Sequence, residues 1–183
     1  MIVIAISGFA GSGKDTVGRL MADALKANGK RVLITHFADL LKYILREFFE
    51  WDGEKDERGR FLLQNVGTEI VKRQFQNYWA DFIVGILKMF GSRWDYVIIP
   101  DLRFPDELSR LREAGFCVVH VEVFRPRLKS KLSDDARAHV SEMAMNGVIP
   151  DFRINNYGNI FQLKQTVVRL VKENLNDKQK RLL

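Results

Sequence analysis

The chain has 183 residues, of which 46% are hydrophobic and 28% charged, and its formal net charge is +6. This length and composition suit one globular domain that buries a hydrophobic core without disulfides or a structural metal. The single cysteine, Cys117, excludes an intrachain disulfide and fits a reducing compartment, so we expect a cytoplasmic protein. A membrane span needs about 18 consecutive apolar residues, and the sequence has no such run and no signal-peptide pattern. The basic residues are scattered along the chain, which disfavours a nucleic-acid partner.

Strand-like and helix-like segments alternate from the first residue onward. Ile2–Ser7 is an unbroken apolar run, typical of a strand buried on both faces. A glycine-rich loop follows, then residues 16–27 predict a helix that Gly29 ends, and 31–36 predict a second strand. The remaining predicted elements are a helix over 40–49, a mobile charged loop over 51–60, a helical stretch over 61–90 with a break near 65–67, strands over 96–100 and 116–124 separated by a helix, a short strand over 152–155, and a closing helix over 160–175.

This alternation predicts an α/β fold, with a parallel five-stranded sheet flanked by helices on both faces. In such sheets ligands bind beyond the carboxyl ends of the strands. The polar residues that could do chemistry fall at those ends, in the stretches 8–16, 101–103 and 125–127 and at Asp39. The sequence therefore predicts one binding site along that edge of the sheet.

The stretch GFAGSGKDT, residues 8–16, joins the first strand to the first helix. Glycines allow a sharp turn and a close approach of the backbone to phosphates, and the amides at a helix start bind anions. The lysine of such a loop reaches the β- and γ-phosphates of ATP. We therefore predict ATP binding by Gly11, Ser12, Gly13, Lys14, Asp15 and Thr16.

The strict phosphate-loop pattern has Ser or Thr directly after the lysine, and here Asp15 takes that place. Asp15 could hold Mg²⁺ through water, or Thr16 could contact the α-phosphate, and both possibilities stay open. A simple glycine turn with a chance lysine is the alternative to a phosphate loop. A dinucleotide-binding loop fits less well, because Thr16 stands where a third glycine or alanine is required.

Beyond this loop, the chain resembles the deoxynucleotide monophosphate kinases of phages and bacteria. The resemblance rests on five blocks in the family's order: FADLLK (37–42), LLQNVGTE (62–69) with Arg73 and Trp79 after it, DLRFPDE (101–107), HVSE (139–142), and the stretch 151–163. The departures are that Leu41 occupies a more usual proline-like position and that Pro100 precedes Asp101.

The resemblance implies a single three-layer P-loop NTPase domain over residues 1–183. It further implies a helical acceptor-binding insertion over about 38–92 and a short lid over about 125–140. The implied activity is Mg²⁺-dependent transfer of a phosphoryl group from ATP to a deoxynucleoside monophosphate, which gives the diphosphate.

The resemblance also implies roles for particular residues. The catalytic set is Lys14, Asp101, Arg103 and Arg125, with Arg127 as a further ATP contact; the acceptor set is Asp39, Lys42, Arg60, Arg73, Trp79, Arg103 and Glu142; the Mg²⁺ set is Asp15 and Asp101. Arginines suit these roles because a planar guanidinium grips phosphate and neutralises charge in the transition state. Trp79 could stack on the acceptor base.

Each role has a structural alternative. Asp101 and Arg103 could pair with each other or cap the next helix, and Arg60 could be solvated. Trp79 could be a core residue, and the block that ends at Glu142 could be a helix start.

Two other functions also stay open. One is a kinase of the same build that acts on dephospho-coenzyme A or phosphomevalonate, and the other is a nucleotide-binding module without catalysis. The partners expected are small nucleotides. A homodimer stays open because six aromatic residues could lie in the core or in an interface: Phe75, Tyr78, Trp79, Phe82, Phe90 and Trp94.

Overall fold

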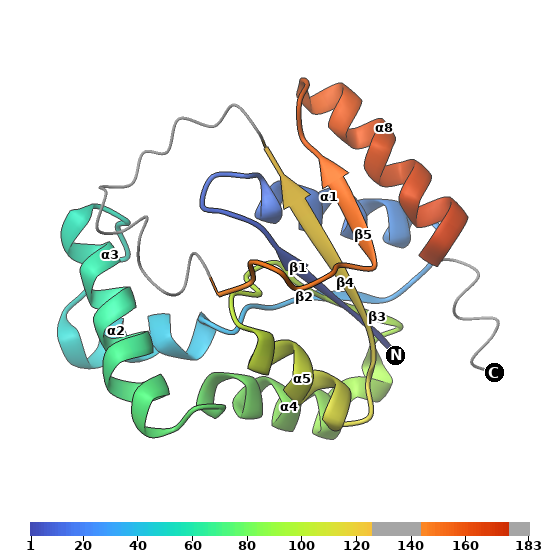
Figure 1. Ribbon diagram of the computed structural model, residues 1–183. Helices are drawn as coiled ribbons and strands as arrows, with labels where there is room; N and C mark the ends of the chain where they lie inside the picture. Colours follow the sequence, from blue (N-terminus) through green and yellow to red (C-terminus); the bar gives the residue numbers. More distant parts are fainter. Residues whose placement is uncertain (126–143, 176–183) are drawn as a thin grey trace.

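The computed structural model describes residues 1–125 and 144–175, and Figure 1 shows their arrangement. One five-stranded sheet has the strand order β2-β3-β1-β4-β5, and every paired strand runs parallel. The predicted parallel sheet is therefore confirmed. The strands are β1 (Ile2–Ser7), β2 (Val32–Ile34), β3 (Tyr96–Ile99), β4 (Cys117–Phe124) and β5 (Phe152–Asn155).

Helices connect the strands and cover both faces of the sheet (Figure 1). They are α1 (Lys14–Ala27), α2 (Asp39–Phe49), α3 (Glu57–Gln64), the π-helix η1 (Asn65–Lys72), α4 (Tyr78–Phe90), the 3₁₀ turn η2 (Gly91–Arg93), α5 (Pro105–Glu113), α8 (Ile160–Leu170) and the π-helix η3 (Val171–Leu175). None of the helices in the described ranges is long and apolar enough to cross a membrane.

The side chains of β1 point alternately into two hydrophobic cores. Ile2, Ile4 and Ile6 pack with residues of α1, α8 and η3 on one face of the sheet. Val3 and Ala5 pack with residues of α2, α4 and α5 on the other face. Because β1 is buried on both sides, each of its positions must be apolar or small, which explains the unbroken apolar run at the start of the chain.

The loop predicted over 51–60 is wrong for its last four residues, which form the start of helix α3 (Glu57–Gln64). Trp51 is buried, and its indole N–H donates to the Glu54 carbonyl at 2.9 Å. Helix α3 begins at Glu57, where the Asp56 carboxylate accepts the Gly59 N–H at 2.7 Å as an N-cap. Burial of one large aromatic ring and a capping carboxylate thus order a segment whose composition suggests a mobile loop.

The helix break predicted near 65–67 is also wrong, since helical structure continues there as η1. The interruption lies instead at residues 75–77, just before α4. Gly67 explains the difference, because helix α2 packs so closely that a Cβ at Gly67 would lie 2.6 Å from Leu41 Cδ2. The glycine serves close helix packing here, and it does not end the helix.

The helical segments α2 to α4 fall within the 38–92 range expected for an acceptor-binding insertion, and that role stays a prediction. The lid predicted over 125–140 lies outside the described residues except for Arg125.

Two helical glycines allow a matched test of this packing. We expect Gly67→Ala to lower the free energy of unfolding by about 1–3 kcal/mol, because the added methyl group overpacks a buried contact. Gly85→Ala in α4 should raise it by about 0.4–1 kcal/mol, because no atom lies within 4 Å of its added Cβ. Urea denaturation measures both, and a Gly67→Ala variant as stable as the parent would contradict the packing argument.

Candidate active site

The loop between β1 and α1 has the geometry of an anion-binding nest. A Cβ at Gly8 would lie 2.3 Å from the Val123 carbonyl oxygen, and Gly8 has a positive φ of 138°. Gly13, at φ 103°, precedes α1 and leaves the first turn of that helix without a side-chain cap. The helix amides therefore remain available to an anion, as phosphate binding requires.

Lys14 and Asn156 fix the shape of this loop. The Lys14 ammonium donates to the carbonyls of Gly8 at 2.5 Å and Phe9 at 3.0 Å, so it lies folded over the loop. The Asn156 amide donates to the Ser12 carbonyl at 2.9 Å, while the Asn156 backbone N–H donates to Phe124 O at 2.8 Å. Asn156 thus ties the loop to the ends of β4 and β5, a role that the sequence analysis missed.

A cavity of about 330 Å³ extends from this loop to α2, α3, η1 and the start of α5. Its volume is in the range of small-molecule sites. The cavity lies beyond the carboxyl ends of the neighbouring strands β1 and β3. From this point the chain runs from β1 toward β2 on one side of the sheet and from β3 toward β4 on the other, and ligands bind at such a switch point. The structure brings eight predicted site residues to its wall: Gly11, Lys14, Asp15, Lys42, Arg60, Trp79, Asp101 and Arg103.

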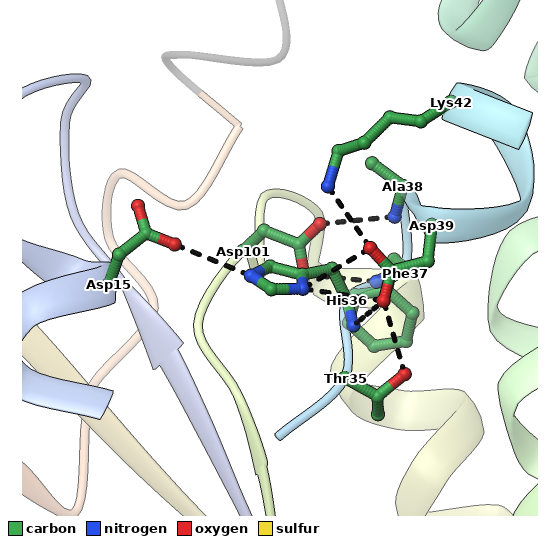
Figure 2. Close-up of polar contacts among 8 residues, drawn as sticks. All are labelled: Asp15, Thr35, His36, Phe37, Ala38, Asp39, Lys42 and Asp101. Carbon is green, nitrogen blue, oxygen red and sulfur yellow. Dashed lines mark hydrogen bonds and ion pairs between the residues drawn. The ribbon is translucent and has the colours of Figure 1, made fainter. Parts of the chain in front are cut away.

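Asp101 follows β3 and holds the turn between β2 and α2. Its carboxylate oxygens accept the backbone N–H of Phe37 at 3.0 Å and of Ala38 at 3.1 Å (Figure 2). This carboxylate therefore fixes the start of α2 against the end of β3. The sequence analysis predicted that Asp101 is catalytic, or that it pairs with Arg103 or caps the next helix, and it did not predict this contact with α2.

Next to it, Glu107 is a buried carboxyl in the cavity wall. One oxygen, Oε2, accepts the N–H of Arg103 at 2.9 Å and of Phe104 at 3.0 Å, as in a capping box at the start of α5. Burial raises the pKa of Glu107 to about 7, although Lys72 opposes that shift. The carboxyl stabilises the backbone from which the Arg103 side chain reaches the cavity.

Lys72 of η1 is a further cation in the cavity wall, and a carboxylate and an aromatic ring lie against its ammonium group. Its ammonium lies 2.7 Å from Asp106 Oδ2 and 3.9 Å from the centroid of the Phe104 ring. Gln64 and Thr68 line the cavity from the same side. Residues 64, 68 and 72 are spaced by four, and this helical spacing is the one sequence signal that could have grouped them.

Trp79 is both a core residue and part of the cavity wall. It is buried, and its indole N–H donates to the Gly67 carbonyl at 2.9 Å. The Tyr78 ring meets it edge-on with 5.0 Å between centroids. The hydrogen bond fixes the orientation of the indole ring, and its stacking on a base stays a prediction.

Asp15 on α1, His36 in the turn after β2 and Asp39 at the start of α2 form a charged network, shown in Figure 2. His36 Nε2 lies 3.3 Å from Asp15 Oδ1, and His36 Nδ1 lies 3.3 Å from the Asp39 carboxylate. The hydrogen bonds that His36 donates to Asp15 and then to Asp39 raise the pKa of His36 to about 9, and the contact with His36 lowers the pKa of Asp15. Burial opposes the shift at Asp39, yet bonds from His36 and Lys42 lower its pKa overall. At neutral pH the imidazole therefore carries a positive charge between two carboxylates.

The other predicted site residues do not line the cavity or lie outside the described ranges. Arg73 is exposed at the end of η1, and Arg125 is exposed after β4. Ser12 and Gly13 belong to the glycine-rich loop, and Asp39 and Thr16 lie in the first turns of α2 and α1. Arg127 and Glu142 fall among the residues that the structure does not describe.

The cavity offers carboxylates that suit a magnesium ion carried by a nucleotide. Within the described residues no group of three or more His, Cys, Asp or Glu side chains could hold a metal by itself. Magnesium in phosphoryl-transfer sites is held by one or two carboxylates, water and the phosphates. Asp15 and Asp101 both line the cavity, so the donor set fits that arrangement.

The raised pKa of Glu107 predicts a dependence of stability on pH. The folded protein holds this proton up to about pH 7, whereas the ordinary pKa is 4.5. The contribution of Glu107 to stability should therefore fall as pH rises from about 4.5 to about 7. Relative to the parent, Glu107→Gln should gain stability between pH 5 and pH 7.5 in urea denaturation. The exposed control Glu113→Gln on the same helix should not, and an equal response of both variants would contradict the prediction.

A profile of the family described as deoxynucleotide monophosphate kinase matches residues 51–167, more than half of the chain. The enzyme of that name from Enterobacteria phage T4 is 31% identical over 115 residues, which cover 62% of this chain and 45% of the phage protein. That from Escherichia phage RB69 is 27% identical over 115 residues, covering 62% and 44%. The chain thus aligns with less than half the length of these curated relatives.

Solved structures support the fold. The Mycobacterium tuberculosis APS kinase CysC in complex with AMPPNP and APS superposes with a TM-score of 0.54 at 15% identity, covering 93% of this chain and 97% of that one. A sugar kinase from Janibacter sp. gives a TM-score of 0.53 at 13% identity, covering 94% and 95%. The fold is that of a P-loop kinase, and by its sequence the chain belongs to the deoxynucleotide monophosphate kinase family.

Proposed function

We propose that this protein transfers the γ-phosphoryl group of ATP to a deoxynucleoside monophosphate. The observation that carries the proposal is the continuous cavity, because it joins the phosphate loop at Lys14 to Arg103 and to the helices of the acceptor side. Two nucleotides bound in one crevice can meet in line, and positioning with charge neutralisation is most of what phosphoryl transfer requires. Family membership supports the same reaction.

On the donor side, the loop amides and Lys14 bind the phosphates of ATP. The Lys14 ammonium already lies within hydrogen-bond distance of two loop carbonyls, Gly8 and Phe9. A phosphate oxygen in the nest can replace those carbonyls with little movement of the side chain. Magnesium bound to the phosphates supplies further positive charge, and Asp15 and Asp101 are the carboxylates that would hold it through water.

On the acceptor side, cationic side chains converge on the same space. Lys42 and Arg60 line the cavity from α2 and α3, and Arg103 lines it from the turn between β3 and α5. The proposal assigns the acceptor phosphate to these groups, with Arg103 foremost because a guanidinium binds two phosphate oxygens at once. Trp79 and Phe104 supply the apolar wall against which a base can lie.

A substrate screen tests the proposed function. The purified protein with Mg²⁺ and ATP should convert at least one common deoxynucleoside monophosphate to its diphosphate. Lys14→Ala should lower that rate by about 10²–10³-fold, since it removes a charge from the transition state, and the variant should still unfold in one cooperative thermal transition. The exposed Lys26→Ala in the last turn of α1 is the matched control and should retain the parent rate.

Failure of every deoxynucleotide and ribonucleotide, with ATP still bound, would exclude the proposal. Turnover of dephospho-coenzyme A or phosphomevalonate would then identify the alternative kinases. Nucleic-acid binding that weakens steeply with salt would instead indicate a non-catalytic module.

The acceptor role of Arg103 makes a separate prediction. Arg103→Ala should raise the KM for the deoxynucleotide by about 10–100-fold, because one charge-assisted contact contributes about 1.5–3 kcal/mol. The KM for ATP should change little. Steady-state kinetics with each substrate varied in turn measures both, and Arg112→Ala, an exposed arginine on α5, is the control. Unchanged acceptor kinetics in Arg103→Ala would show that another cation binds the phosphate.

A further inference from the structure

Asp15 is the residue by which this chain departs from the usual phosphate loop, and the structure shows what holds it. The side chain lies in the first turn of α1, is 64% exposed, and has Lys14 as its neighbour in sequence. A carboxylate so close to a triphosphate repels it unless a cation intervenes. The orientation of Asp15 therefore matters more than that of an ordinary surface aspartate.

The contact that orients Asp15 comes from His36, in the turn between β2 and α2. His36 Nε2 lies 3.3 Å from Asp15 Oδ1, and the imidazole itself lines the cavity. In Figure 2 the Asp15 carboxylate points toward the imidazole ring. Among the described residues, His36 is the one whose side chain hydrogen-bonds the Asp15 carboxylate.

Contacts with Asp39 fix the position of His36. Its backbone N–H donates to Asp39 Oδ2 at 2.8 Å, and its ring contacts the same carboxylate. Lys42 holds Asp39 from the next turn of α2 at 3.0 Å. Asp101 anchors the two residues that follow His36, through their amides. The imidazole is thus presented to Asp15 by a turn that cannot easily shift.

We propose that His36 is a positioning residue for Asp15. Its ring N–H holds the carboxylate in one orientation, at the place where other phosphate loops carry a hydroxyl, so that Asp15 can meet the magnesium that accompanies ATP. This inference rests on the proposed function, in which Mg²⁺ and ATP bind at the loop. In this proposal His36, two residues after β2, orients the magnesium ligand, whereas in other phosphate loops a hydroxyl of the loop itself binds the metal.

Two substitutions at His36 distinguish the contact of Nε2 with Asp15 from the contact of Nδ1 with Asp39. The amide nitrogen of Gln can take the place of Nε2 and reach Asp15, whereas that of Asn takes the place of Nδ1 and reaches Asp39 alone. Loss of a group that orients a metal ligand typically costs about 10–100-fold in metal affinity. We therefore expect His36→Asn to raise the half-saturating Mg²⁺ concentration by about tenfold, and His36→Gln to stay within about threefold of the parent.

The measurement has two readouts. One is the Mg²⁺ dependence of ATP binding without acceptor, followed with a fluorescent ATP analogue, and the other is the Mg²⁺ dependence of the initial rate. Thr35→Val is the matched control, because it disturbs the same turn through its 3.4 Å contact with Asp39 and leaves the Asp15 contact intact. Melting temperatures show that each variant is folded.

A double-mutant cycle tests whether His36 acts through Asp15. Adding His36→Asn to Asp15→Asn should change the Mg²⁺ dependence by less than about twofold, since the two changes remove the same interaction. Equal shifts in His36→Asn and His36→Gln, no shift in either, or additive effects in the cycle would each overturn the proposal. If no deoxynucleotide is phosphorylated but the binding readout behaves as expected, the proposed function fails and the positioning role stands.

Discussion

One carboxylate, that of Asp101, sets the distance between the two halves of the site. It binds the amides of Phe37 and Ala38 and so fixes the start of α2 at the end of β3. The N–H of Leu102 donates to Ile6 O at 3.1 Å, which joins the same strand end to β1, just before the phosphate loop. Helix α2, and with it the segment predicted to bind the acceptor, therefore begins at a fixed place relative to the glycine-rich loop. The proposed reaction needs that constraint, because two phosphates must meet in one place.

The charges around the cavity follow from this arrangement. Lys14, Lys42 and Arg60 line the cavity from three helices, Arg103 lines it from the turn before α5, and His36 adds an imidazolium. Some of the cations at the cavity are paired with carboxylates. Asp39 contacts Lys42 and His36, and Asp106 binds Lys72, a further cation of the cavity wall. The proposed binding of two polyanions requires such an excess of positive charge, and the ion pairs order these side chains within the described part of the chain.

The sheet and the phosphate loop could be predicted from the sequence because their signals are local. An apolar run buried on both faces and a glycine-rich turn with a lysine each constrain neighbouring residues, whatever the rest of the chain does. The loop over 51–60 and the break near 65–67 were mispredicted because tertiary contacts decide them. Trp51 enters the core, and Gly67 accommodates Leu41.

The same distinction separates the site residues that could be predicted from those that could not. Lys14, Asp101 and Arg103 belong to recognisable motifs at strand ends. The contributions of His36, Lys72 and Asn156 depend on partners 21, 34 and 144 residues away in sequence. Glu107 stands within a recognised motif, yet its burial shows only in the folded chain. Short motifs therefore located the site, and the structure identified the residues that hold it in shape.

If donor and acceptor nucleotides bind in one crevice, an analogue that joins adenosine to a deoxynucleoside through a chain of phosphates should occupy both positions at once. A crystal structure with that analogue should show one molecule per chain, with its phosphates between the loop at Lys14 and the guanidinium of Arg103. Phosphates bound elsewhere, or a cavity that holds only one of the two nucleosides while the other remains in solvent, would contradict it.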